Sequence, residues 1–356
     1  MSSNLDNAKN ALDSIIKKSR VHLYKPIQIA EILYKNRKTQ DVNDLTDLES
    51  YRNASKKWRD MVCMQFLGRV CTSSAKFQDN LFEKNAMPPY LLKNLGIENA
   101  NNNGIVEAYI YKAFEKKHLQ LENALAYCLN STGNNFKIKE FLKQFWEQPG
   151  LKRSLDKIFE IVVYSLFEVL TTAIEVKVDI YYDKNQLNLI KEFSDFAYKV
   201  LNLSSTSKRK TLDAHFNRVG VTNAADRGLD MYANFGSVVQ IKHLSLDEDL
   251  AEDVVTSITS DRIIIVCKNS EETVINTLLT QIGWRSRIQA VITIDELVTW
   301  YDKALKGNFS NILGKRIIST LANEIKTEFP SVGSNDFQKF KKERGYSKLR
   351  SEYWEL

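Results

Sequence analysis

Apolar residues repeat at helical spacings of three and four along most of the first 149 residues. This spacing places the apolar side chains on one face of a helix. Pro26 falls where the first turn of a helix tolerates proline, and the dipeptide Pro149-Gly150 interrupts the pattern. The sequence therefore predicts a helical domain over residues 1–149. Its expected helices cover residues 27–37, 47–70, 106–129 and 138–146.

The pattern changes beyond residue 150. Residues 152–173 carry a dense apolar stripe at helical spacing, residues 175–182 alternate as a strand, and residues 262–267 form the unbroken β-branched run of a buried strand. We set residues 185–222 aside as a basic insertion, with a helix over 185–203 and a basic loop over 204–220. The remaining expected elements are strands at 229–233, 238–242 and 289–294 and helices at 246–258, 271–282 and 295–305.

The order of these elements predicts the fold class. Without the insertion, the second half of the chain reads helix, three strands, helix, strand, helix, strand. This order is typical of an α+β or α/β protein with a mixed central sheet flanked by helices. We expect this second domain to cover residues 150–310 and a basic helical tail to cover residues 311–356.

Two strands of this domain present polar residues on one face. Side chains two apart in a strand share a face, so Gln240 and Lys242 project together, and a turn at residues 234–237 brings Asp230 beside them. Carboxylate and amide oxygens are hard ligands suited to Mg²⁺, and a lysine can stabilise charge on a phosphate. An ordinary amphipathic hairpin with a solvated polar face explains the same local pattern equally well.

Other polar residues could also contribute to a site at this hairpin. Glu160 falls at the edge of the apolar stripe of helix 152–173, where it can reach a cleft between helix and sheet or simply remain exposed. Asp226 sits beside Arg227 in an expected loop, where a structural ion pair is its favoured role. His243 should face away from Lys242 and pack instead.

Composition narrows the classes of function. The chain has 356 residues and a net charge of +6, which fits either a polyanionic partner or a basic solvated surface. Four scattered cysteines and four scattered histidines exclude a zinc site and a nucleophilic triad by their spacing. No phosphate-binding glycine loop, signal-peptide core or membrane-spanning apolar run occurs, so we expect a cytoplasmic protein.

The three residues Asp230, Gln240 and Lys242 and the order of the elements together resemble the PD-(D/E)XK nuclease superfamily, with Gln240 where an acid is usual. More specifically, the chain resembles the HaeII-type restriction endonucleases over most of its length, Gln included. The matching segments are KSRVHLYKPIQIAEILY, SKKWRD, TSSAKFQDNLF, GLKRSLDKIFEIVVYSLF, RGLDMYANFG and VQIKHLSL. This resemblance implies a type II restriction endonuclease that cuts double-stranded DNA at a palindrome of the form RGCGCY.

The resemblance also implies a magnesium-dependent mechanism. Asp230 would be the principal Mg²⁺ ligand, with Gln240 contributing its side-chain oxygen and Ile241 its backbone carbonyl. Lys242 would orient or deprotonate the attacking water, and Glu160 would hold the metal through water. Because Gln is neutral, we expect one tightly held ion per active site.

A palindromic target implies a homodimer with one active site per strand. The helical domain would then serve DNA contact, dimerisation or both, and a cognate DNA methyltransferase would be a functional companion without a stable complex. The candidate DNA-binding residues are Lys208, Arg209, Lys210, Arg218, Arg227, Arg285 and Arg287.

Two other functions fit the same sequence. One is a structure-specific repair or junction nuclease with the same chemistry. The other is a non-catalytic DNA-binding regulator whose nuclease core is degenerate at Gln240. Cleavage of defined duplexes distinguishes all three.

Overall fold

A computed structural model describes residues 2–19, 22–39, 41–70, 80–83, 86–147, 155–219, 229–242, 260–269 and 287–355. Two compact units can be distinguished. Unit 1 contains residues 1–130, 140–155 and 322–356, and unit 2 contains residues 131–139 and 156–321. Both ends of the chain therefore belong to unit 1.

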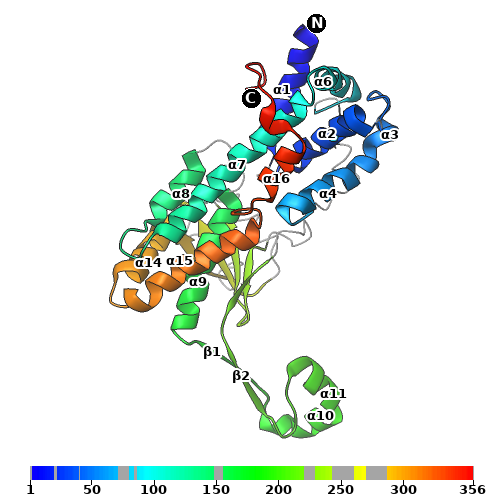
Figure 1. The fold of residues 1–356 in the computed structure, drawn as a ribbon. Helices are drawn as coiled ribbons and strands as arrows, with labels where there is room; N and C mark the ends of the chain where they lie inside the picture. The colour runs from blue at the N-terminus through cyan, green and yellow to red at the C-terminus, as the bar shows by residue number, and fades with distance from the viewer. Residues whose placement is uncertain are drawn as a thin grey trace. The chain divides into compact units, whose positions relative to one another are not determined.

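Unit 1 is helical, as the sequence predicts (Figure 1). Pro26 lies in the first turn of α2, and Gly68 ends α4 with a φ of 67°, a left-handed conformation that glycine adopts without strain. The core of this unit joins residues from both ends of the chain, such as Leu12, Phe66 and Trp354. The helices are α1 Ser2–Lys18, α2 Tyr24–Tyr34, the π-helix η1 Lys35–Thr39, α3 Leu48–Arg52, α4 Ala54–Leu67, α6 Pro89–Asn101, α7 Ile105–Asn130, most of α8 Ile138–Glu147, α16 Asp336–Glu343 and the 3₁₀ turn η5 Tyr346–Lys348.

The side chain of Arg59 lies on the buried side of α4, whereas the sequence pattern predicts it on the exposed side. The helical pattern places Arg59 outward with Arg52, Lys56 and Lys57, but its side chain is fully buried. The guanidinium donates to the Asp60 carboxylate at 2.6 and 2.9 Å and to the Gln28 side chain at 3.1 Å. Because an adjacent acid and a buried amide satisfy it, this arginine can be buried, and it is not available to a phosphate.

Unit 2 is built on a five-stranded mixed sheet with the order β3-β4-β5-β6-β7. β3 pairs antiparallel with β4 and β4 with β5, whereas β5, β6 and β7 run parallel. The helix α9 Leu155–Ala173 precedes the sheet in the chain, and the Tyr301 hydroxyl of α14 donates to the Val162 carbonyl of α9 at 2.8 Å. The bounds are β3 Phe216–Arg218, β4 Met231–Ala233, β5 Val238–Lys242, β6 Ile263–Cys267, β7 Ile288–Thr293, α14 Ile294–Lys306 and α15 Ser310–Glu328. This arrangement confirms the predicted fold class.

The first strand of the sheet is not the one expected. The sequence pattern assigns residues 175–182 to the meander, but β1 Lys177–Tyr181 pairs with β2 Arg209–Asp213 in a separate two-stranded ribbon. The meander begins instead with β3, inside the stretch read as a basic loop over residues 204–220. An alternating strand fits an exposed ribbon as well as a sheet edge, so alternation alone could not separate the two. The inserted segment is therefore the ribbon with the helices at its end.

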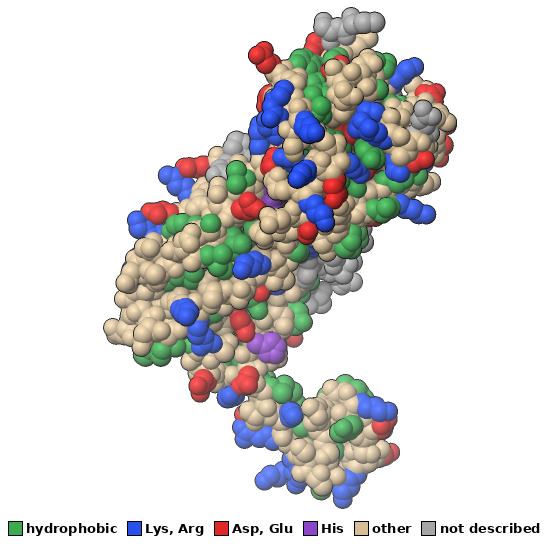
Figure 2. Space-filling view, viewed as in Figure 1, with side chains coloured by type: hydrophobic (Ala, Val, Ile, Leu, Met, Phe, Trp, Pro, Cys, Tyr) green, Lys and Arg blue, Asp and Glu red, His purple; other side chains and the backbone are tan. Residues whose placement is uncertain are grey.

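We call residues 174–213 the arm and residues 187–201 its tip. The ribbon of β1 and β2 carries at its end the 3₁₀ turn η3 Lys184–Gln186, α10 Leu187–Glu192, α11 Ser194–Phe196 and the π-helix η4 Ala197–Leu201 (Figure 1). Cross-strand ion pairs join Lys177 to Asp213 and Arg209 to Asp179 in the ribbon. Apolar and charged side chains both reach the surface of the arm (Figure 2).

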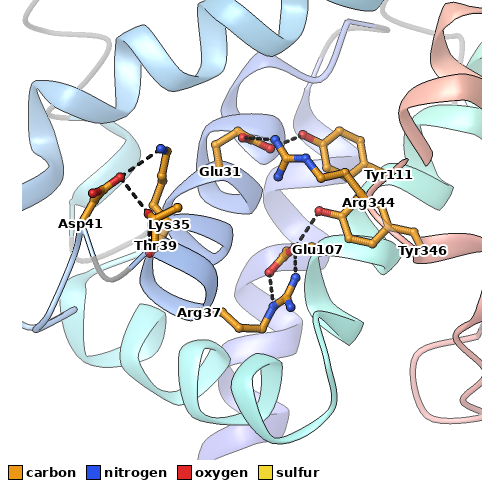
Figure 3. A network of polar contacts seen from close by, with 9 residues as sticks. All are labelled: Glu31, Lys35, Arg37, Thr39, Asp41, Glu107, Tyr111, Arg344 and Tyr346. Atoms are coloured by element: carbon orange, nitrogen blue, oxygen red, sulfur yellow. Dashed lines mark hydrogen bonds and ion pairs between the residues drawn. The ribbon is translucent and has the colours of Figure 1, made fainter. Parts of the chain in front are cut away.

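A buried polar network holds the C-terminal residues of unit 1 against its N-terminal helices (Figure 3). Glu107 of α7 accepts hydrogen bonds from Arg37 at 2.9 and 3.0 Å, from Asn99 at 2.6 Å and from the Tyr346 hydroxyl at 2.6 Å. Glu31 of α2 accepts from Arg344 at 3.0 Å and from the Tyr111 hydroxyl at 2.7 Å. Cations of the predicted basic tail are therefore engaged within the unit.

Several predicted features lie outside the described residues. They are the helices at 246–258 and 271–282, the break at Pro149-Gly150, and the side chains of Asp226, Arg227, His243 and Arg285. Within the described part of the chain, no helix is both long and apolar enough to cross a membrane.

Candidate active site

The β4–β5 hairpin brings Asp230 and Gln240 into direct contact, as the sequence predicts. Asp230 immediately precedes β4, and the turn between the strands contains Gly236 with a φ of 99°. One carboxylate oxygen of Asp230, Oδ2, accepts from Gln240 Nε2 at 2.8 Å and from the Ile241 backbone N–H at 2.7 Å. These two bonds fix the carboxylate against β5.

The side-chain oxygen of Gln240 is left without a protein donor. Gln240 is 3% exposed, and among the described residues its Oε1 has no hydrogen-bond partner. A buried acceptor without a partner costs roughly 1–3 kcal/mol, so such atoms are normally satisfied by water or an ion. Since the amide nitrogen already donates to Asp230, the oxygen is the atom that Gln240 offers to a ligand.

Helix α9 adds a second acid to this site. Glu160 is 5% exposed, and the Lys157 ammonium lies 2.7 and 2.8 Å from its two carboxylate oxygens. Burial raises the pKa of Glu160 to about 7; the Lys157 charge acts against this shift, and the Asp230 charge adds to it. The interaction with Asp230 places Glu160 beside the hairpin, and the alternative of an exposed boundary glutamate is wrong.

Burial also raises the pKa of Asp230, although the Ile241 N–H, Lys242 and Lys157 each favour its charged form. Two desolvated carboxyl groups near each other repel and so favour a bound cation between them. Lys242 ends β5 on the same strand face as Gln240 and is half-buried. The structure thus brings together the four predicted residues Asp230, Gln240, Lys242 and Glu160.

The donor set suits a hard divalent cation. Its members are the Asp230 carboxylate, the unpartnered Gln240 oxygen and the nearby Glu160 carboxylate, and all of these donors are oxygens, which Mg²⁺ prefers. Over the described ranges, no three His, Cys, Asp or Glu side chains gather in a metal-binding group. Among the described residues, the Gln240 oxygen and the Ile241 backbone carbonyl are the further oxygens available beside the two carboxylates.

Two further cations belong to this site that the sequence analysis did not assign to it. Lys157 lies one helical turn before Glu160, a spacing at which side chains of a helix meet. Arg218, predicted as a DNA contact, lies on β3 opposite Met231, and its charge favours the charged form of Glu160. Helical spacing could have revealed Lys157, but only the sheet order brings Arg218 to the acids.

The other candidate DNA-binding residues have mixed surroundings. Lys208 is exposed and Lys210 half-buried on the arm, whereas Arg209 pairs with Asp179, whose pKa it lowers to about 2 together with Thr211. Arg287 immediately precedes β7, and its Nε donates to the Ser260 carbonyl at 2.9 Å.

In unit 2 a mixed sheet follows a long helix, an acid precedes the second strand of the sheet, and a lysine ends the third strand. This arrangement is consistent with the nuclease core expected from the resemblance to the PD-(D/E)XK nucleases. Comparison with known proteins makes the assignment specific. A model of the HaeII restriction endonuclease family matches residues 8–346. The chain belongs to the HaeII restriction endonuclease family, whose activity class is the type II site-specific deoxyribonucleases.

Two curated relatives match nearly the whole chain. The type II restriction enzyme HaeII of Haemophilus aegyptius is 56% identical over 341 residues, which are 96% of this chain and 97% of that protein. The type II restriction enzyme NgoBI of Neisseria gonorrhoeae is 54% identical over 340 residues, 95% of this chain and 96% of that protein. No solved structure matches the chain.

Proposed function

We propose that this enzyme makes Mg²⁺-dependent double-strand cuts in DNA at a short palindromic site of the form RGCGCY. The contact of Asp230 with Gln240, which leaves Gln240 Oε1 buried and unpartnered, carries the metal part of this proposal. The family and the two relatives named as type II restriction enzymes support the substrate and the type of site. The enzyme would act in the cytoplasm, where its DNA substrate lies.

In this mechanism Asp230, Gln240 Oε1 and the Ile241 carbonyl would hold Mg²⁺, and Glu160 would support the ion indirectly, through water. When bound, the ion supplies positive charge that stabilises the transition state at the scissile phosphate. Lys242 orients or deprotonates the attacking water and neutralises charge on the phosphate. The water oxygen bonds to phosphorus and gives up a proton to Lys242 or to solvent, while one bridging P–O bond breaks and its leaving oxygen takes up a proton from solvent.

Lys157 has a separate role in this proposal. Its ammonium lies on both oxygens of Glu160 and is only partly exposed. A buried carboxylate without a counter-charge is costly, so Lys157 balances Glu160 whenever no divalent cation is present. When a divalent cation binds, the cation and Lys157 share the two acids of the site.

A palindromic target with one active site per chain requires two copies related by a two-fold axis. We therefore expect a homodimer on DNA and a cognate methyltransferase that modifies the same site without forming a stable complex. The basic residues Lys208, Lys210 and Arg287 remain proposed DNA contacts, and Arg218 is more closely associated with the acids.

Digestion of a sequenced phage DNA tests the proposed function directly. With Mg²⁺, the mapped ends should fall symmetrically within RGCGCY sites on both strands, and a chelator should stop cleavage. Branched and linear duplexes digested in parallel form the control. Preference for branched substrates would indicate a junction nuclease, and tight site-specific binding without cleavage in Mg²⁺ or Mn²⁺ would indicate a non-catalytic regulator.

Replacing Gln240 by Glu should strengthen divalent-cation binding. The change adds a negative charge beside Asp230 and removes the amide donor, so a cation gains about tenfold or more in affinity from one extra charge at short range. Calorimetric titration with Mn²⁺ in the absence of DNA measures this directly. Gln289→Glu, on an exposed position of β7, is the matched control. Equal affinities for Gln240→Glu and the unmodified enzyme would exclude Gln240 as a ligand.

A further inference from the structure

The tip of the arm exposes more apolar surface than a solvated segment normally carries. Phe193 and Phe196 are each 54% exposed, and Tyr198 is 68% exposed. Within residues 187–201 only Ala197 is buried. The other exposed apolar residues of the tip are Leu189, Val200 and Leu201.

The tip has no core of its own that could stabilise it. α10 has six residues and α11 has three, which is far below the length at which isolated helices are stable in water. Helices this short depend on tertiary packing of their apolar faces, and here most of the apolar side chains are exposed instead. Several large apolar side chains exposed within one short segment are typical of a surface that another molecule covers.

The charges of the tip argue against DNA as that molecule. The tip contains two cations, Lys191 and Lys199, and two acids, Glu192 and Asp195. Lys199 pairs with Asp195 at 3.0 Å. DNA-binding surfaces carry an excess of cations that neutralise phosphates, whereas an apolar centre with balanced charge is typical of protein interfaces.

The same charge balance identifies the partner. Around a two-fold axis a surface meets its own copy, so it must be self-complementary and cannot carry a large net charge. The tip meets this requirement, since its two cations balance its two acids and its net charge is zero. We propose that the arm tip binds the arm tip of a second copy of this chain and so forms the dimer contact. This inference rests on the proposed function, which requires two copies on one palindrome.

Removing apolar side chains from the tip tests this contact. Phe196→Ser with Tyr198→Ser should weaken dimerisation at least about 30-fold, because exposed aromatics at the centre of an interface are frequent hot spots. Sedimentation of the full-length protein without DNA gives the dimer dissociation constant. The matched control is Phe309→Ser with Ile312→Ser, which removes two similarly exposed apolar side chains outside the arm and should leave dimerisation unchanged.

A charge exchange tests the identity of the partner. One variant carries Glu192→Lys and Asp195→Lys, and a second carries Lys191→Glu and Lys199→Glu. Each tip then repels its own copy, so each variant alone should sediment as a monomer. An equimolar mixture should form a dimer again, which shows that both variants are folded. The mixture is the decisive measurement, because only tip-to-tip contact predicts restored pairing.

The outcomes separate this inference from the proposed function. A monomeric unmodified enzyme, tip variants that remain dimeric, or a charge-exchange mixture that stays monomeric would each overturn the contact, whatever the cleavage result. Tip variants that stay dimeric but bind DNA less tightly would assign the tip to DNA. If the sedimentation results are as expected but the enzyme does not cut at a palindrome, the proposed function is overturned and the tip contact remains in place.

Discussion

Asp230→Asn should reduce DNA cleavage at least about 10³-fold while site-specific binding is retained, because removal of one member of a catalytic group costs at least this much. Asn keeps an oxygen that can accept from the Ile241 N–H, so the hairpin should stay in place. It loses the negative charge that the proposed mechanism needs to hold Mg²⁺. Cleavage of a plasmid with a single site and a mobility-shift assay in Ca²⁺ measure the two effects separately.

The control for this prediction is Asp302→Asn on α14. Asp302 is exposed and paired with Lys306 at 3.1 Å, so its substitution should leave cleavage unchanged. Asp230→Asn should also unfold at a temperature no lower than that of the unmodified enzyme, since a neutral side chain is cheaper to bury than a carboxylate. Cleavage by Asp230→Asn at near the unmodified rate would remove Asp230 from the mechanism.

Glu107→Ala should lower the free energy of unfolding by about 3–5 kcal/mol, the range found when one partner of a buried charge pair is removed. Glu107 is fully buried and receives bonds from Arg37 and Tyr346 (Figure 3), and also from Asn99. Alanine leaves all three donors without this acceptor, and Arg37 keeps its charge. Denaturant unfolding followed by circular dichroism measures the change.

Glu115→Ala is the matched control for Glu107→Ala. Glu115 lies on the same helix, α7, and also bonds the C-terminal segment, through Lys341 at 2.8 Å and Gln338 at 2.8 Å. Its carboxylate reaches solvent, so the pair should contribute at most about 1 kcal/mol. Should Glu107→Ala fail to fold, Glu107→Gln supplies the comparison, because it removes the charge but keeps an acceptor. Equal losses from Glu107 and Glu115 would contradict the importance of burial here.

The C-terminal residues show how far a charge pattern can be interpreted. The predicted basic tail carries a cluster of cations over residues 339–350, and the sequence fits a contact with DNA, a contact with a second subunit or a solvated helix equally well. In the structure Lys341 pairs with Glu115 and Arg344 pairs with Glu31. Acids more than two hundred residues away in the chain satisfy these cations. Pairs between residues so far apart in the chain cannot be predicted from the charge pattern. A run of positive charge by itself therefore does not indicate a free surface.

The hairpin of the candidate active site was predictable because its determinants are local. Period-two alternation places Gln240 and Lys242 on one face, and four consecutive turn residues bring Asp230 to the same place. The helix that carries Glu160 follows in the same way from apolar spacing. Where neighbouring residues along the chain determine the orientation of a side chain, that orientation can be predicted from the sequence without knowledge of the tertiary structure.

The remaining features needed the tertiary structure, because long-range pairing decides them. The residues of β1 alternate as well as those of a sheet strand, yet the partner strand β2 takes them into the arm, and β3 starts the meander instead. Arg218 reaches the acids only through the sheet order, and Arg59 is buried only because Gln28 and Asp60 satisfy it. The sequence alone determined the helical character of the first 149 residues, helix α9, the family resemblance and the acid, amide and lysine of the hairpin. The tertiary structure decided which strand borders that hairpin, which cations surround its acids and which surface remains uncovered at the tip of the arm.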